Sequence, residues 1–137
     1  MRSVQLSLVT LGMLFLTATA SRANPPASEF DSAKLEYFEK KVRPILVNHC
    51  YACHSAETKP SGDLRVDDRG GLIAGGNNGP AVVPGSPEKS LLIKRVLPSD
   101  KRRMPLEGEH LTDEQIAILS KWIADGAAWP PDRKSVV

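Results

Sequence analysis

The only two cysteines of the chain lie three positions apart and are followed directly by a histidine, in the run Cys50-Tyr51-Ala52-Cys53-His54. This C-x-x-C-H pattern is the attachment signature of c-type haem. Cys50 and Cys53 can form thioethers with the two vinyl groups of one porphyrin, and His54 is then held beneath the iron as its proximal ligand. The motif therefore predicts one covalently bound haem c.

Other uses of these residues fit the surrounding sequence less well. A thioredoxin-like pair follows a hydrophobic strand, whereas the segment before Cys50 has the pattern of a helix. A structural zinc site needs a second pair of ligands, and the other histidines, His49 and His110, are far apart in the sequence. A disulfide between the cysteines would close a very small loop and add little stability. Redox-active thiols and metal binding stay open as alternatives.

The first residues have the pattern of an export signal. Arg2 precedes an apolar stretch over residues 6–20, which is short for a transmembrane helix and suits the core of a signal peptide. Small residues predict cleavage after Ala23, with a second site after Ala20, and an uncleaved membrane anchor is the alternative. We therefore predict that residues 1–23 are a signal peptide, that the protein is periplasmic or otherwise extracytoplasmic, and that no transmembrane span remains after cleavage.

The charge balance gives no indication of a nucleic-acid partner. The chain has 18 basic and 16 acidic residues, and loss of Arg2 and Arg22 with the signal peptide makes the mature chain neutral. The aromatic content of 5% is low for a domain that must bury a core on its own. We therefore expect the porphyrin to lie at the centre of the core and the apoprotein to be loosely folded.

The mature chain is predicted to comprise a flexible leader over residues 24–29, a cytochrome c domain over residues 30–130 and a short tail over residues 131–137. Apolar residues from Phe30 to Leu46 recur at helical spacing, with a kink or a fresh helical start near Pro44. These apolar residues include Phe38, Val42 and Ile45, which follow one another at intervals of four and three residues. The segment therefore predicts a helix that leads into the C-x-x-C-H motif.

The rest of the chain predicts long loops and three further helices. Residues 55–86 are rich in glycine and proline, with one short helix that Asp67 caps and Gly75-Gly76 stops. Ser86-Pro87-Glu88 opens a helix that runs to about Leu97. In the last helix Thr112 and Gln115 form a capping box, Ile116, Leu119 and Ile123 line one face beside Trp122, and Gly126 is the stop. No stretch alternates as a strand would, so the predicted fold class is all-α.

The sixth ligand of the iron is predicted to be Met104, the only methionine left after export. It lies in a loop between two predicted helices, and Pro105 favours an extended backbone at Met104, which suits a ligand presented from a strap. An ordinary buried methionine and ligation by His110 are the alternatives, whereas His49 adjoins Cys50 and is not expected to reach the opposite haem face. Ligation by methionine and histidine favours electron transfer over oxygen chemistry.

Three basic residues, Lys101-Arg102-Arg103, directly precede Met104. They could neutralise the haem propionates or dock an acidic redox partner. In the third interpretation, these three residues belong to a loop that is merely exposed to solvent and have no specific role.

Several motifs, in this order, resemble those of the planctomycete-type cytochrome c domain. They are Val42-Arg43-Pro44-Ile45-Leu46 before the haem motif, Gly62-Asp63-Leu64-Arg65, Gly79-Pro80-Ala81-Val82-Val83-Pro84-Gly85, Ser90-Leu91-Leu92-Ile93, Met104-Pro105, and Trp122-Ile123 through Trp129-Pro130. The resemblance covers residues 30–130 and implies the small helical bundle of class I cytochromes c around one haem. It also implies that Cys50 and Cys53 carry the haem, with His54 proximal and Met104 distal. Leu106 stands where the family often has a second proline.

No constellation of acid, base and nucleophile is visible in the sequence. We therefore predict an exported monohaem electron carrier, not an enzyme, that exchanges single electrons with redox partner proteins by outer-sphere transfer. The alternatives are a peroxidase-like enzyme, which requires Met104 to leave the iron, and a redox-sensing or interaction module. Because members of this family commonly carry the domain at the front of much longer proteins, the N-terminal fragment of a larger multidomain protein is a further alternative.

Overall fold

The computed structural model describes residues 27–131, with side chains from residue 31 onward. The predicted signal peptide lies outside these residues, as do residues 24–26 of the predicted leader and nearly all of the predicted tail. Residues 27–29, predicted as part of the flexible leader, belong to the first helix instead. Within the described range the regular structure is helical, with no strand and one isolated bridge between Gly76 and Gly79, which confirms the all-α prediction. No helix in this range is long and apolar enough to cross a membrane.

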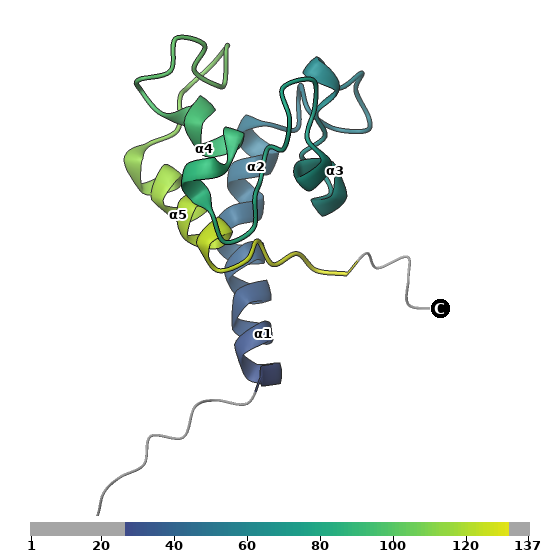
Figure 1. The fold of residues 1–137 in the computed structure, drawn as a ribbon, viewed down its shortest axis with the longest axis vertical. Coiled ribbons are helices and arrows are strands. Elements are labelled where there is room, and N and C mark those ends of the chain that lie inside the picture. Colours follow the sequence, from purple (N-terminus) through teal and green to yellow (C-terminus); the bar gives the residue numbers. More distant parts are fainter. Residues whose placement is uncertain (1–26, 132–137) are drawn as a thin grey trace, which may run out of the picture.

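The first helical rod leads directly to the haem motif. It consists of α1 (Ala27–Tyr37), a π-helical turn η1 (Phe38–Val42) and α2 (Arg43–His49), and Figure 1 shows the three as one continuous column. The irregularity that Pro44 predicts lies directly before it, where the Arg43 N–H bonds to the Phe38 carbonyl, five residues back. Pro44 has no N–H and cannot donate the next α-helical hydrogen bond. The π-helical turn η1 accommodates this missing bond.

The short helix α3 (Arg69–Ala74) forms where predicted but begins one residue later. Its cap is Asp68, whose carboxylate accepts a hydrogen bond from Gly71 N at 2.7 Å. The prediction that Asp67 is the cap is wrong, because the Asp67 carboxylate accepts from Ala56 N at 2.9 Å and pairs with Arg65 at 3.1 Å. Gly75 ends the helix with φ of +75°, as expected for the predicted stop.

The predicted helix from Ser86 to Leu97 is divided into η3 (Pro87–Lys89), a 3-10 turn, and α4 (Leu91–Val96). Ser90 separates them with an extended backbone, φ −80° and ψ 122°. Its buried hydroxyl donates to Ser86 O at 3.0 Å and accepts from Val83 N at 2.9 Å. Serine side chains that bond to nearby backbone compete with helix formation, which explains the break. A further 3-10 turn, η2 (Ser61–Asp63), precedes α3.

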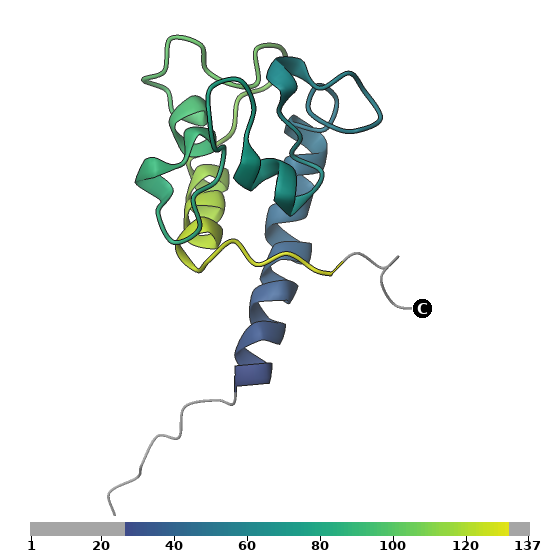
Figure 2. The ribbon, with the colours of Figure 1, turned by 45° about the vertical axis from the view of Figure 1, so that its right-hand side comes forward.

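The last helix, α5 (Asp113–Ala124), begins with the predicted capping box. Thr112 Oγ1 accepts from Gln115 N at 3.2 Å, and the Gln115 side chain accepts from Thr112 N at 2.9 Å. Gly126 follows the helix with φ of +102°. The helix packs against η1 and α4, as Figures 1 and 2 show, and buries the predicted apolar face, which consists of Ile116, Leu119, Trp122 and Ile123.

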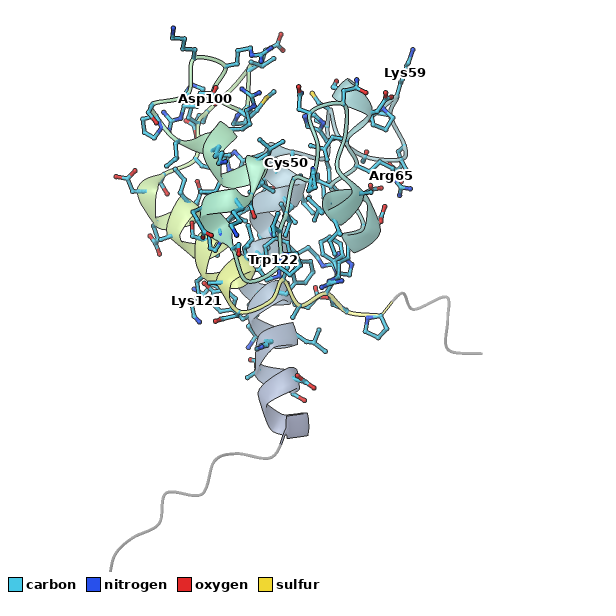
Figure 3. All side chains as sticks on the ribbon, viewed as in Figure 1. Cys50, Lys59, Arg65, Asp100, Lys121 and Trp122 are labelled. Atoms are coloured by element: carbon cyan, nitrogen blue, oxygen red, sulfur yellow. The ribbon has the colours of Figure 1, made fainter. Side chains whose placement is uncertain are left out.

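Much of the aromatic content is concentrated in one cluster. The ring of Phe38 lies 5.7 Å from that of Trp122 and 4.4 Å from that of Trp129, centroid to centroid. The Arg43 guanidinium lies 4.9 Å from the Phe38 centroid and pairs with Glu39. This cluster is built on η1 and α5, whereas Cys50 follows the far end of α2 (Figure 3). These rings therefore pack on one another without any residue of the haem motif, although Cys50 borders the same hydrophobic core.

Candidate haem site

The haem motif forms a single turn directly after α2. Cys50 N donates to Leu46 O at 2.9 Å, which closes the helix, and the Cys50 carbonyl then accepts from Cys53 N at 3.2 Å and His54 N at 3.0 Å. Two donors that converge on one carbonyl wind residues 50–54 into one turn. The cysteines and the histidine are therefore presented together at the end of the rod.

The His54 ring is oriented by a backbone carbonyl. Its Nδ1 lies 3.3 Å from Leu64 O. Because a carbonyl oxygen only accepts hydrogen bonds, this contact places the proton on Nδ1 and leaves the lone pair on Nε2. Histidines that bind metals are typically held in this way through their other ring nitrogen. The backbone of His54 is fixed as well, since its carbonyl accepts from Val66 N at 2.8 Å.

A glycine contact supports the segment that carries Leu64. Asn77 N donates to Gly62 O at 3.0 Å, and a Cβ added to Gly76 would lie 2.2 Å from the same oxygen. Only glycine permits this approach of the two backbones. Neither Leu64 nor Gly76 was identified as a site residue from the sequence, although Leu64 is part of the run Gly62-Asp63-Leu64-Arg65 and Gly76 is part of the predicted helix stop.

The two cysteine thiols have different environments. Cys50 is half-buried and packs against the hydrophobic core, whereas Cys53 is exposed. Burial raises the pKa of the Cys50 thiol to about 11, and the neighbouring Cys53 adds a smaller effect in the same direction. Both are free thiols in this structure, available for two thioether bonds.

Met104 is half-buried and packs against the hydrophobic core. Its backbone N–H donates to Arg95 O, in α4, at 2.7 Å, and the Met104–Pro105 peptide bond is cis. The loop that carries Met104 and the segment that follows Cys50 lie at the same end of the molecule, away from the start of α1, in both Figure 1 and Figure 2.

The other two histidines, His49 and His110, differ in their surroundings. His110 is exposed. His49 lies 3.3 Å, Nε2 to Nε2, from the side-chain amide of Gln115, in the capping box of α5. Since the amide nitrogen donates, His49 Nε2 is the acceptor. His49 is the last residue of the rod that presents Cys50, and its ring contacts the first turn of α5.

The basic run before Met104 is not uniform. Lys101 and Arg102 are exposed, whereas the Arg103 guanidinium donates from Nε to Val96 O at 3.0 Å and from Nη2 to Leu111 O at 3.1 Å. The sequence alone does not distinguish these three residues. The Arg103 side chain therefore binds the backbone at both ends of the loop that carries Met104.

Asp100 organises the first part of the same loop. Its carboxylate accepts from Arg102 N at 2.7 Å and pairs with Arg95 Nη1 at 3.2 Å. The hydrogen bond from the Arg102 N–H is the main reason why the pKa of Asp100 lies below its ordinary value of 3.8, and the Arg95 guanidinium acts in the same direction.

This depressed pKa gives a testable pH dependence. The Asp100 carboxylate stabilises the fold fully above about pH 4, and the contribution is lost as the pH falls through the lower pKa of the folded state. Asp100→Asn should therefore unfold at a lower temperature than wild type at pH 7, and the difference should shrink below pH 4. Thermal unfolding at both pH values tests this, with Glu109→Gln at an exposed position of the same loop as the control. Equal stability at pH 7 would contradict it.

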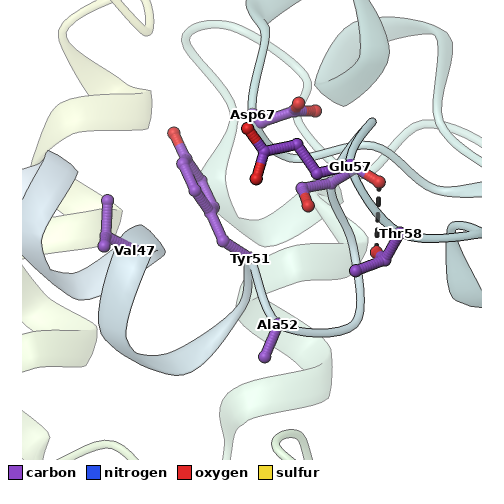
Figure 4. A pocket seen from close by; sticks show the side chains of 7 residues that line it. Val47, Tyr51, Ala52, Glu57, Thr58 and Asp67 are labelled. Atoms are coloured by element: carbon purple, nitrogen blue, oxygen red, sulfur yellow. Dashed lines mark hydrogen bonds between the residues drawn. The ribbon is translucent and has the colours of Figure 1, made fainter.

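A cavity of about 450 Å³ lies beside the motif, on Tyr51 and Ala52 (Figure 4). Within it Thr58 Oγ1 donates to Ser55 O at 3.2 Å. The Tyr51 hydroxyl is buried with no hydrogen-bond partner, and burial is the main reason why its pKa is raised. The remaining lining residues are Val47, Glu57 and Asp67. Cys50, Cys53 and His54 do not line this cavity, so it is distinct from the candidate haem site.

The residues of the site fit haem c. The motif turn supplies two thiols, His54 supplies a nitrogen lone pair on an oriented ring, and Met104 supplies a thioether sulfur. Further apolar side chains, Leu64, Leu92 and Leu97, pack against the core but are only partly buried by it. The described residues contain no group of three or more His, Cys, Asp and Glu side chains that could hold a metal ion without a cofactor.

These features define the candidate site as that of a c-type cytochrome. In agreement, the family model of planctomycete cytochrome C matches residues 50–108 of the chain. The match includes the haem motif, the Leu64 segment and Met104, but not the rod before the motif or α5. The family implies covalently bound haem c and electron transfer. No curated protein and no solved structure matches the chain.

Proposed function

We propose that this protein is an exported cytochrome c with one covalent haem, which carries single electrons between redox partner proteins. The observation that carries the proposal is the turn after α2, in which His54 follows Cys53 directly and has its ring held by Leu64 O at 3.3 Å. A redox-active thiol pair has no need of a histidine oriented in this way, and the described residues contain no group of three or more His, Cys, Asp and Glu side chains that could hold a zinc ion. The family match over residues 50–108 supports the same function.

Each residue of the site has a distinct role in this proposal. Cys50 and Cys53 would form the two thioethers, and His54 Nε2 and Met104 Sδ would be the two protein ligands of the iron. When bound, haem c supplies an iron that cycles between the ferric and ferrous states. Two protein ligands leave no open position, so the chain excludes small-molecule substrates and restricts the site to electron transfer.

The proposed domain extends over residues 30–130, beyond the family match on both sides. The structure supports this extent, because the rod before the motif and α5 pack together in one core that includes Phe38, Val42, Leu119 and Trp122. The apolar stretch over residues 6–20 is the basis for proposing a signal peptide over residues 1–23 and a periplasmic location.

Redox and ligand-binding measurements on the complete chain test the function. We expect the protein, produced with a haem-attachment system, to be reduced reversibly by one electron, and its ferrous form to bind no carbon monoxide at neutral pH. Binding of carbon monoxide by the wild type would show an open coordination position and would favour the enzyme or sensor alternative. A haem that extracts into acidified organic solvent would contradict covalent attachment.

A further inference from the structure

One side chain joins the two ends of the loop that carries Met104. The Arg103 guanidinium donates to Val96 O at 3.0 Å and to Leu111 O at 3.1 Å. Val96 is the last residue of α4, and Leu111 directly precedes Thr112, the cap of α5. The loop over residues 97–110 is therefore closed by Arg103, the residue next to Met104.

These two hydrogen bonds suit an arginine in particular. Carbonyl groups at the end of a helix have no partner within the helix, so Val96 O is available as an acceptor. A charged guanidinium forms stronger hydrogen bonds than a neutral donor, and its planar fork can span two separate carbonyls. A lysine concentrates its donors on one nitrogen and does not reproduce this span.

Hydrogen bonds of Arg103 and of Met104 itself hold the backbone at Met104. Arg103, the preceding residue, is anchored through its guanidinium, and the Met104 N–H donates to Arg95 O at 2.7 Å. Asp100 adds a third tie, since it accepts from Arg102 N at 2.7 Å and pairs with Arg95. The backbone at Met104 is therefore fixed relative to α4 by contacts of its own segment.

We propose that Arg103 is a positioning residue for Met104, which sets how firmly the methionine sulfur is held as the sixth ligand. The inference rests on the proposed function, because it requires Met104 to be a ligand. Arg103 Nε and Nη2 already donate to the backbone, so its role in the basic run differs from that of the exposed Lys101 and Arg102.

Three variants of the full-length haem protein test this assignment. Arg103→Ala removes both hydrogen bonds, Arg103→Lys keeps the charge without the fork, and Arg102→Ala removes an exposed neighbouring charge. The readouts are the weak near-red charge-transfer band of methionine-ligated ferric haem, the reduction potential, and carbon monoxide binding by the ferrous protein. These report on the iron–sulfur bond rather than on overall stability.

The expected results separate the three variants. In Arg103→Ala the fraction of ferrous protein with a dissociated methionine should rise about tenfold or more, because two hydrogen bonds to a charged group are lost. The ferrous variant should then bind carbon monoxide where wild type does not, the band should weaken and the reduction potential should fall. Arg103→Lys should be intermediate, and Arg102→Ala should match wild type.

Two outcomes would overturn the inference in distinguishable ways. If wild type has the band and Arg103→Ala unfolds at a lower temperature but keeps the wild-type band, potential and inertness to carbon monoxide, Arg103 has only a structural role and the proposed function stands. If wild type lacks the band, ligation by Met104 and the role of Arg103 both fail. Should Arg103→Ala fail to accumulate with haem, Arg103→Lys decides the question by the same readouts.

Discussion

A variant with serine at both Cys50 and Cys53 should carry no covalent haem and should lose its cooperative thermal unfolding. Serine cannot form the thioethers, so the porphyrin is no longer attached to the motif turn. The partly buried side chains Leu64, Leu92 and Leu97 would then remain incompletely covered. We expect partial helicity without a sharp transition, as in a compact state that has lost specific packing. Mass spectrometry and circular dichroism during heating measure the two effects.

Single-cysteine variants control for the loss of a thiol. Cys53→Ala should retain one thioether and hence a haem that survives denaturation, together with a cooperative transition. In the double variant, residual helicity should come from the segments that form the aromatic cluster of Phe38, Trp122 and Trp129, since these rings pack on one another directly. A sharp transition of the double variant at the wild-type temperature would show that the haem is not needed to complete the core.

Features set by neighbouring residues were predictable from the sequence. The capping box at Thr112 and Gln115, the stop at Gly126 and the irregularity at Pro44 depend on local backbone chemistry, and the structure confirms all three. The C-x-x-C-H motif belongs with them, because its turn is completed within five residues.

Features that depend on tertiary partners were predicted incompletely. Asp67 and Asp68 are equivalent as caps in the sequence, and Arg65 pairs with both of them. The difference between them is the hydrogen bond that the Asp67 carboxylate accepts from Ala56 N. Ser90 interrupts a plausible helix because its hydroxyl is buried where it meets the backbone of Val83 and Ser86. Local propensity carries no information about either arrangement.

The supporting residues of the site were the least predictable. Leu64 orients His54 through a backbone carbonyl, and any residue type has such a carbonyl. Arg103 was recognised only as part of a basic run, because its partners at Val96 and Leu111 are brought together by the way α4 and α5 are joined. Residues that carry the chemistry were therefore identified from their side chains, whereas residues that position them required the fold.

Replacement of Met104 by alanine should open the iron to external ligands. The variant should bind carbon monoxide in the ferrous form and should have a lower reduction potential, within the range of about 0.8 V over which axial ligands set haem potentials. Met104→His should keep the iron six-coordinate at a lower potential, and both variants should lose the near-red band. The control is His110→Ala, at an exposed position of the same region, which should keep the band. If wild type lacks the band, and if ferrous His110→Ala binds carbon monoxide while ferrous Met104→Ala does not, then His110 is the ligand and Met104 is an ordinary buried methionine. The segment anchored to Arg95 would then hold no iron ligand.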